Sequence, residues 1–382
     1  MSNRKAILAA ALLLLSALGM AQTSTPAEAI ALQQQGKLEE AARAWKAVTE
    51  RNPRDAAAFA SLGVVRSRQQ KYADAAAAYR RALAIDPKLP GIDLNLGLAE
   101  FKQGHFPAAV TALRAALTAD PSSTQVQTLL GLSYYGAKNF VLASQYLEPV
   151  AQADPSNAEL HQTLAQSCLW AKKYDCALEE FHKLMELDPN SAAAHVLTGE
   201  ALDGLGRTSE AIAEFETAEK TSPREPNLHF GLGYLLWKLR QYDRARQEFE
   251  AELALDPNHA QALAYLGDIE WKNNHPDAAL FLFKRAIQRD HDLRIVYVDL
   301  GALYMQQKNY KEAQAALLRA VALDPELADA HYQLGRMYQA IGNTAAAEKE
   351  LGKVRELHEN ADQSLVGKMP ASPSPSHPPE TK

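Results

Sequence analysis

The stretch GLGYLLWKLRQYDRA, Gly231 to Ala245, decides the fold, because it carries two small residues that recur at a constant interval along the chain. Gly233 and Ala245 return as Gly or Ala every 34 residues. Phe230, Tyr234 and Trp237 are separated by steps of four and three, which brings them to one side of a helix. The stretch therefore belongs to a helical repeat, and the spacing of the small residues gives the length of the repeat.

Prolines mark the same period. They stand at positions 53, 87, 121, 155, 189, 223, 257 and 325, and His291 occupies the one remaining slot. A frame that starts at Gln22 divides the chain into ten repeats of 34 residues that end at Ala361, with starts at 22, 56, 90, 124, 158, 192, 226, 260, 294 and 328. Such a period predicts stacked supersecondary units rather than one globular core.

Three positions of the frame are nearly constant. Position 20 is Ala in all ten repeats, from Ala41 to Ala347, and position 24 is always large and apolar, from Trp45 to Leu351. Position 8 is Gly or Ala throughout. Small residues let two helix axes approach closely, and the large residue fills the remaining space.

Each repeat is therefore predicted to be a helical hairpin. Positions 4, 7, 8 and 11 share one side of a first helix, and positions 20, 24 and 27 share one side of a second. The second helix should stop at the Asp-Pro pair, because the residue before proline is pushed out of helical geometry. Thr25-Pro26-Ala27-Glu28 supplies a capping box at the start of the first repeat.

This pattern, with large residues at positions 4, 7, 11 and 24, Gly or Ala at 8, Ala at 20 and Pro at 32, resembles the tetratricopeptide repeat family. The resemblance covers Gln22 to Ala361 and implies an all-α, right-handed superhelical solenoid of stacked hairpins. It also implies a concave groove, lined by the first helices, in which an extended peptide or a partner helix binds. Glu28 replaces a large apolar residue in the first repeat, which is typical of a polar terminal cap.

In the family, positions 2, 5, 9, 12 and 13 of each repeat line the groove. Two interpretations of these residues stay open: they seal each first helix against its neighbour, or they provide a rigid amphipathic surface for a partner. The residues predicted for the groove are Phe101, Tyr135, Trp170, Glu200, Asp203, Phe230, Tyr234, Trp237, Lys238, Asp268, Trp271, Lys272 and Met305.

The two ends of the chain differ from the repeats. Arg4 and Lys5 precede an apolar run, and small residues lead up to Ala21, so residues 1–21 are predicted to be a signal peptide cleaved after Ala21. An uncleaved anchor is the alternative, although the run is shorter than the roughly 20 residues of a spanning helix. Residues 362–382 are rich in Pro and Ser and are predicted to be a disordered tail.

Two cysteines are candidates for a disulfide, and four histidines are candidates for a metal site. Cys168 and Cys176 lie near the turn of the fifth repeat, where they either form a disulfide or remain buried thiols. The histidines at position 4 occupy a packing slot, and equivalent positions of adjacent repeats are about a helix diameter apart, so packing is favoured over a shared metal ion. These histidines are His161, His195, His229 and His331.

The remaining sequence favours binding over catalysis. The sequence contains no serine elbow, HExxH or paired-cysteine metal motif, and the net charge of -6 argues against a nucleic-acid partner. We expect a non-catalytic, exported scaffold, periplasmic or secreted, that needs no cofactor and binds a protein segment or helix in its groove. The alternative is an accessory scaffold of polysaccharide assembly or export, whose aromatic residues stack on glycan rings.

Overall fold

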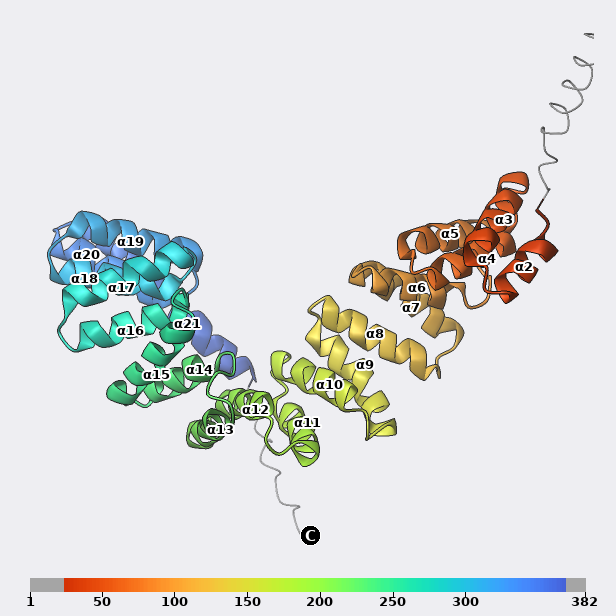
Figure 1. The fold of residues 1–382 in the computed structure, drawn as a ribbon. Coiled ribbons are helices and arrows are strands. Elements are labelled where there is room, and N and C mark those ends of the chain that lie inside the picture. The colour runs from red at the N-terminus through yellow and green to blue at the C-terminus, as the bar shows by residue number, and fades with distance from the viewer. Residues whose placement is uncertain (1–23, 369–382) are drawn as a thin grey trace, which may run out of the picture. The chain divides into compact units, whose positions relative to one another are not determined.

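The computed structural model describes residues 24–368, which form two compact units on either side of the bond between Pro189 and Asn190 (Figure 1). The N-terminal unit contains repeats one to five, and the C-terminal unit contains repeats six to ten. All secondary structure in the described residues is helical, and strands are absent from them. The predicted signal peptide, residues 1–21, lies outside the described residues.

Each repeat is a pair of helices, which confirms the predicted fold. The first helices are α2 (Pro26–Gln34), α4 (Ala56–Arg68), α6 (Ile92–Lys102), α8 (Thr124–Gly136), α10 (Ala158–Trp170), α12 (Ala192–Gly204), α14 (Leu228–Lys238), α16 (Ala260–Lys272), α18 (Arg294–Gln306) and α20 (Ala328–Ala340). The second helices are α3 (Leu38–Arg51), α5 (Tyr72–Ile85), α7 (Phe106–Ala119), α9 (Phe140–Ala153), α11 (Tyr174–Leu187), α13 (Thr208–Thr221), α15 (Tyr242–Leu255), α17 (Pro276–Arg289), α19 (Tyr310–Leu323) and α21 (Thr344–Lys368).

The core of each hairpin is the contact between positions 8, 20 and 24. The alanine at position 20 is between 0% and 2% exposed in every repeat. A Cβ atom added to any of the eight glycines at position 8 would lie 2.4 to 2.8 Å from the large side chain at position 24 of the same repeat. In these eight repeats the glycine allows close packing, because a methyl group there would overlap the facing side chain; Ala29 and Ala165 hold the same position in the first and fifth repeats.

The ends of the helices follow local chemistry. Helix α5 ends at Ile85, and Asp86, which precedes Pro87, adopts an extended conformation with φ -131° and ψ 97°. Thr25 caps α2 through a hydrogen bond that its hydroxyl accepts from the backbone N–H of Glu28 at 3.2 Å. Within the hairpins, the residue at position 15 has φ between 58° and 76° in all ten repeats, for example Lys172 and Gly206. This left-handed residue reverses the chain between the two helices.

The C-terminal boundary differs from the prediction. Helix α21 continues to Lys368, so residues 362–368, which we predicted to be the start of a disordered tail, are helical. The segment up to Lys368 contains no proline, and the first proline of the tail is Pro370, so nothing in its backbone chemistry ends the helix at Ala361. Residues 369–382 lie outside the described residues.

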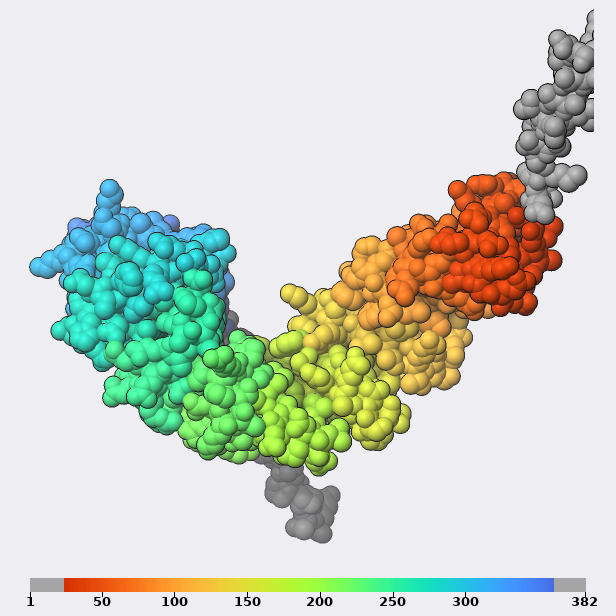
Figure 2. Space-filling model, viewed as in Figure 1, coloured from red at the N-terminus to blue at the C-terminus, as the bar shows by residue number. Residues whose placement is uncertain are grey.

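Repeats pack mainly on their sequence neighbours. In the C-terminal unit, α13 contacts α14 and α15 contacts α16, and successive first helices also touch, as α14 does with α12 and α16. In the space-filling view, neighbouring colours of the sequence lie side by side in each unit (Figure 2). Side chains on first helices of adjacent repeats can therefore meet.

Gly267→Ala tests the core contact, and Gly352→Ala is its control. The new Cβ of Gly267→Ala would lie 2.7 Å from Phe283, which is fully buried, so we expect a loss of about 1–3 kcal/mol. Gly352 is also helical, but its nearest contact would be a distal arginine atom at 3.7 Å. We expect Gly352→Ala to gain about 0.5–1 kcal/mol from helix propensity. Urea unfolding measures both, and equal effects would contradict the assigned packing.

Candidate functional site

A cluster of aromatic rings lies on two neighbouring first helices of the C-terminal unit, α14 and α16. We call Phe230, Tyr234 and Trp237 of α14, together with Tyr265 of α16, the aromatic wall. The centroid of Tyr265 lies 5.0 Å from that of Trp237, 5.5 Å from that of Tyr234 and 6.1 Å from that of Phe230. All four residues are partly exposed. The wall therefore joins two repeats and still presents ring surface to solvent.

The residue at position 12 hydrogen-bonds to the following repeat. Trp237 Nε1 donates to Asp268 Oδ2 at 2.6 Å, and the Tyr135 hydroxyl donates to Gln166 Oε1, also at 2.6 Å. Both acceptors stand at position 9 of the next repeat. Trp271 Nε1 donates to Gln306 of the next repeat at 3.0 Å. These rings thus hold adjacent first helices in register, and each keeps a partly exposed face.

The charged residues predicted for the groove largely neutralise one another. Lys238 Nζ lies 2.6 Å from Asp203 Oδ1 and 5.6 Å from the centroid of the Tyr234 ring. Lys272 forms an ion pair with Asp268, and its ammonium nitrogen lies 5.5 Å from the centroid of the Trp237 ring. Asp268 is only 6% exposed. These four side chains leave no unmatched charge on the wall.

Two hollows flank the aromatic wall. One, of about 310 Å³, lies between α12 and α14, and the other, of about 150 Å³, lies between α14, α16 and α18. The larger hollow has room for a few side chains and lies at the lower limit of roughly 300 Å³ for ligand pockets, and the smaller one has room for the end of one side chain. The larger hollow is lined by Glu200, Asp203, Phe215, Asn227, Phe230, Gly231, Tyr234, Leu235 and Gln261, and the smaller by Trp237, Ala264, Tyr265, Asp268, Lys272, Ile295 and Asp299.

One carboxyl group in each hollow lacks a partner. Within residues 24–368, neither Glu200 nor Asp299 takes part in a hydrogen bond or an ion pair. Loss of hydration beside the surrounding side chains raises the pKa of Glu200, although the residue is exposed to solvent. Burial raises the pKa of Asp299 to about 8, and the nearby Asp268 carboxylate raises it further than Lys272 lowers it.

The N-terminal unit has an aromatic cluster of its own. The Trp170 ring centroid lies 5.7 Å from that of Tyr135 and 4.8 Å from that of Phe140, and Trp170 is 47% exposed. Phe101 packs edge-on against Phe106. Among the predicted residues of the C-terminal unit, Trp271 and Met305 lie outside the aromatic wall and are partly buried against hydrophobic clusters.

Two residues of the site were not predicted from the sequence. Tyr265 and Asp299 both stand at position 6 of their repeats, which is outside the positions implied by the family resemblance. Asp299 interrupts the apolar run from Ile295 to Leu303, and this unusual acidic residue was the one signal in the sequence.

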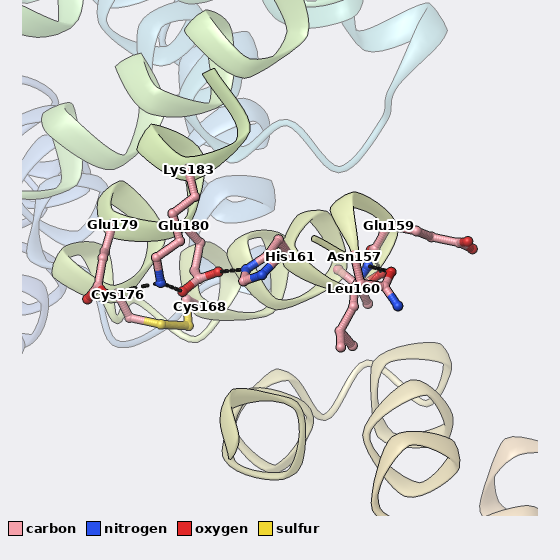
Figure 3. A network of polar contacts seen from close by, with 10 residues as sticks. Asn157, Glu159, Leu160, His161, Cys168, Cys176, Glu179, Glu180 and Lys183 are labelled. Carbon is pink, nitrogen blue, oxygen red and sulfur yellow. Dashed lines mark hydrogen bonds and ion pairs between the residues drawn. A yellow bond between two sulfur atoms is a disulfide. The ribbon is translucent and has the colours of Figure 1, made fainter. Parts of the chain in front are cut away.

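The position-4 histidines serve the hairpin cores. The Nδ1 atoms of His195, His229 and His331 lie 2.6, 2.8 and 2.6 Å from a glutamate carboxylate at position 23 of the same repeat. His161 makes the same contact with Glu180, which also binds Lys183 (Figure 3). In the same repeat, the structure joins Cys168 and Cys176 by a disulfide that connects α10 to α11.

One of these histidines lies in a group with the composition of a metal site. Glu219, His229 and Glu248 bring three ligand atoms within 4.8 Å of one another. However, the second ring nitrogen of His229 lies 2.8 Å from the carbonyl oxygen of Pro223, and the first is used by Glu248. Both nitrogens therefore already make hydrogen bonds, and a metal ion would have to displace one of them.

Comparison with known families identifies the class of the chain. Models described as Tetratricopeptide repeat match residues 27–90, 68–132, 134–201 and 230–292, and one described as TPR repeat matches residues 301–342. The chain belongs to the tetratricopeptide repeat family. Such proteins bind protein partners and are generally non-catalytic, so the fold is that of an interaction scaffold.

One solved structure shares the fold at low sequence identity, and two others match with lower TM-scores. The APC/C hetero-tetramer Cut9-Hcn1 matches with a TM-score of 0.53 and 15% identity, over 89% of this chain and 82% of that one. YrrB, described as a TPR protein with an unusual peptide-binding site, matches with a TM-score of 0.39 and 22% identity, over 50% of this chain and 99% of that one. A structure described as MamA MSR-1 C2 matches with a TM-score of 0.38 and 27% identity, over 43% of this chain and 95% of that one.

No curated protein matches the sequence of the chain. Among the described helices, none combines the length and the apolar character that crossing a membrane requires.

Asp299→Asn tests the unmatched carboxyl group through the pH dependence of stability. Because the pKa of Asp299 is raised from 3.8 to about 8 on folding, the folded state holds a proton that the unfolded state releases, and stability falls as pH rises between these values. We expect the variant to match the wild type near pH 4 and to melt about 2–4 °C higher at pH 8.5. A variant that is less stable at pH 8.5 would contradict this assignment.

Proposed function

We propose that the protein is an exported scaffold and that the aromatic wall of the C-terminal unit binds a segment of a partner protein. The observation that carries the proposal is the partly exposed cluster of four rings between two hollows. Aromatic side chains offer large contact area at a low entropic cost and dominate the hot spots of protein interfaces. The rings lie between the two hollows. A partner segment could therefore place side chains in the hollows while its backbone crosses the rings.

The wall is already rigid before a partner binds. Tyr265 contacts three other rings, and the hydrogen bond from Trp237 to Asp268 limits rotation of the indole. A rigid surface loses little conformational entropy on binding, which favours affinity. The inter-repeat contacts of these rings therefore support a binding role as well as a structural one.

Export is the second part of the proposal. It rests on Arg4, Lys5 and the apolar run that precedes Ala21. The disulfide between Cys168 and Cys176 supports it, since such bonds persist in oxidising compartments such as the bacterial periplasm.

Substitution of single aromatic residues of the wall should weaken the binding of selected peptides. Twelve-residue peptides are selected from a displayed random library on the wild-type protein, and their affinities are measured by fluorescence anisotropy. We expect Tyr234→Ala and Trp237→Ala each to weaken binding about tenfold or more, because each removes ring surface at the centre of the contact.

Phe281→Ala is the matched control. Phe281 lies on the second helix α17, is 62% exposed, and does not belong to the wall. Its loss should change affinity less than twofold, and thermal melting should show that all three variants are folded. Selection of no peptide, or binding of soluble glycans that is lost in Trp237→Ala, would overturn the proposal in favour of a polysaccharide role.

Processing of the N-terminus tests export. The full-length chain is expressed in a Gram-negative host, and the protein is recovered from the periplasmic fraction. N-terminal sequencing should begin at Gln22, and thiol titration without reductant should detect no free cysteine. A chain that retains Met1 in the cytosolic fraction would contradict this part of the proposal.

A further inference from the structure

The two carboxyl groups without partners indicate what kind of segment fits the wall. Glu200 lies in the hollow at α12 and α14, and Asp299 lies in the hollow at α16 and α18. The aromatic wall separates them. The neighbouring acidic residues Asp203 and Asp268 both pair with lysines, so Glu200 and Asp299 are the acidic groups of the two hollows that remain available to a cationic partner.

We infer that the aromatic wall recognises a basic segment, with one cationic side chain in each hollow, where Glu200 and Asp299 pair with it. This inference rests on the proposed function and specifies the chemistry of the partner. A guanidinium or ammonium group supplies the positive charge that each hollow lacks, and its aliphatic stem packs on the rings. Arginine fits best, because its planar head also stacks on aromatic faces.

The smaller hollow illustrates the fit. Its volume of about 150 Å³ accommodates the end of one side chain, and its walls are the Trp237 and Tyr265 rings and the exposed Ile295. Asp268 and Lys272 on α16 compensate each other, which leaves Asp299 as the one unmatched acidic group of this hollow. An anionic side chain would instead face two carboxyl groups, and an apolar one would leave Asp299 without a partner.

Binding should also depend on pH. The charged groups around Asp299 are Asp268 and Lys272 from α16, Asp329 from α20 and Arg294 from its own helix, and Asp329 and Arg294 pair with each other at 2.6 Å. Because burial holds the pKa of Asp299 at about 8, an arginine must displace a proton at neutral pH. Arginine itself stays charged throughout this range. Affinity should therefore rise as pH increases from 6.5 to 9.

Labelled twelve-residue peptides of Ser, Ala and Leu test the inference, each carrying two arginines separated by two to six residues. Matched peptides carry citrulline, which has nearly the same shape without the charge. We expect the best arginine peptide to bind at least tenfold more tightly than its citrulline counterpart by fluorescence anisotropy. Glu200→Gln and Asp299→Asn should each reduce this preference about fivefold, and Asp299→Asn should remove most of the rise in affinity with pH.

Two controls carry the same changes of charge elsewhere. Asp277→Asn on α17 and Glu250→Gln on α15 alter exposed acidic residues outside both hollows and should change affinity less than twofold. Circular dichroism and thermal melting verify that each variant is folded.

The outcomes separate the two proposals. If arginine and citrulline peptides bind equally, and Tyr234→Ala weakens both, the wall binds segments but the basic preference is wrong. If the two control variants on α15 and α17 lose as much affinity as Glu200→Gln and Asp299→Asn, the attraction is a general charge effect and the inference is also wrong. If neither arginine peptides nor library peptides depend on Tyr234, the proposed function itself is overturned.

Discussion

The contact between the position-8 glycine and the large residue at position 24 is the constraint on which the rest of the structure depends. A Cβ atom at Gly233 or Gly267 would overlap the facing phenylalanine, so the two helices of a hairpin can be this close only without it. The fully buried alanine at position 20 meets the same requirement from the second helix. Dense packing at this point sets the geometry of each hairpin, and identical hairpins then stack in the same way.

Stacking leaves one side of each first helix outside the core of its own hairpin. In the C-terminal unit, side chains on this side both contact the next repeat and remain partly exposed. Trp237 reaches the next repeat through Asp268 and Tyr265, which stabilises the stack. The same rings keep exposed surface beside two hollows. Sealing and binding are therefore compatible roles of one set of side chains, because a ring can contact its neighbour with one face and solvent with the other.

Polar groups in the hairpin cores have hydrogen-bond partners, whereas a carboxyl group in the smaller hollow has none among the described residues. Inside the hairpins, the position-4 histidines are satisfied by glutamates 19 residues later, as in the pair of His229 and Glu248. In the smaller hollow beside the wall, Asp299 is half-buried and has no partner within residues 24–368, although loss of hydration disfavours its charge. Because a poorly hydrated acid without a partner costs stability, we connect Asp299 with the binding role proposed for its hollow rather than with folding.

The sequence by itself determined the period, the ten hairpins, the core positions and the ends of the second helices in the first nine repeats, because these depend on local propensity and on recurring spacings. It also indicated Phe230, Tyr234 and Trp237 as a stripe outside the hairpin core. Only the tertiary structure decided that Tyr265 completes the wall, that Lys238 neutralises Asp203, and that Glu200 and Asp299 remain unmatched. These contacts join residues 28 to 35 positions apart on adjacent first helices, as in the ring contact of Tyr265 with Trp237 and the bond from Lys238 to Asp203. They depend on how closely the helices approach and on which rotamers fit between them, and neither quantity can be obtained from the spacing of residues along one helix.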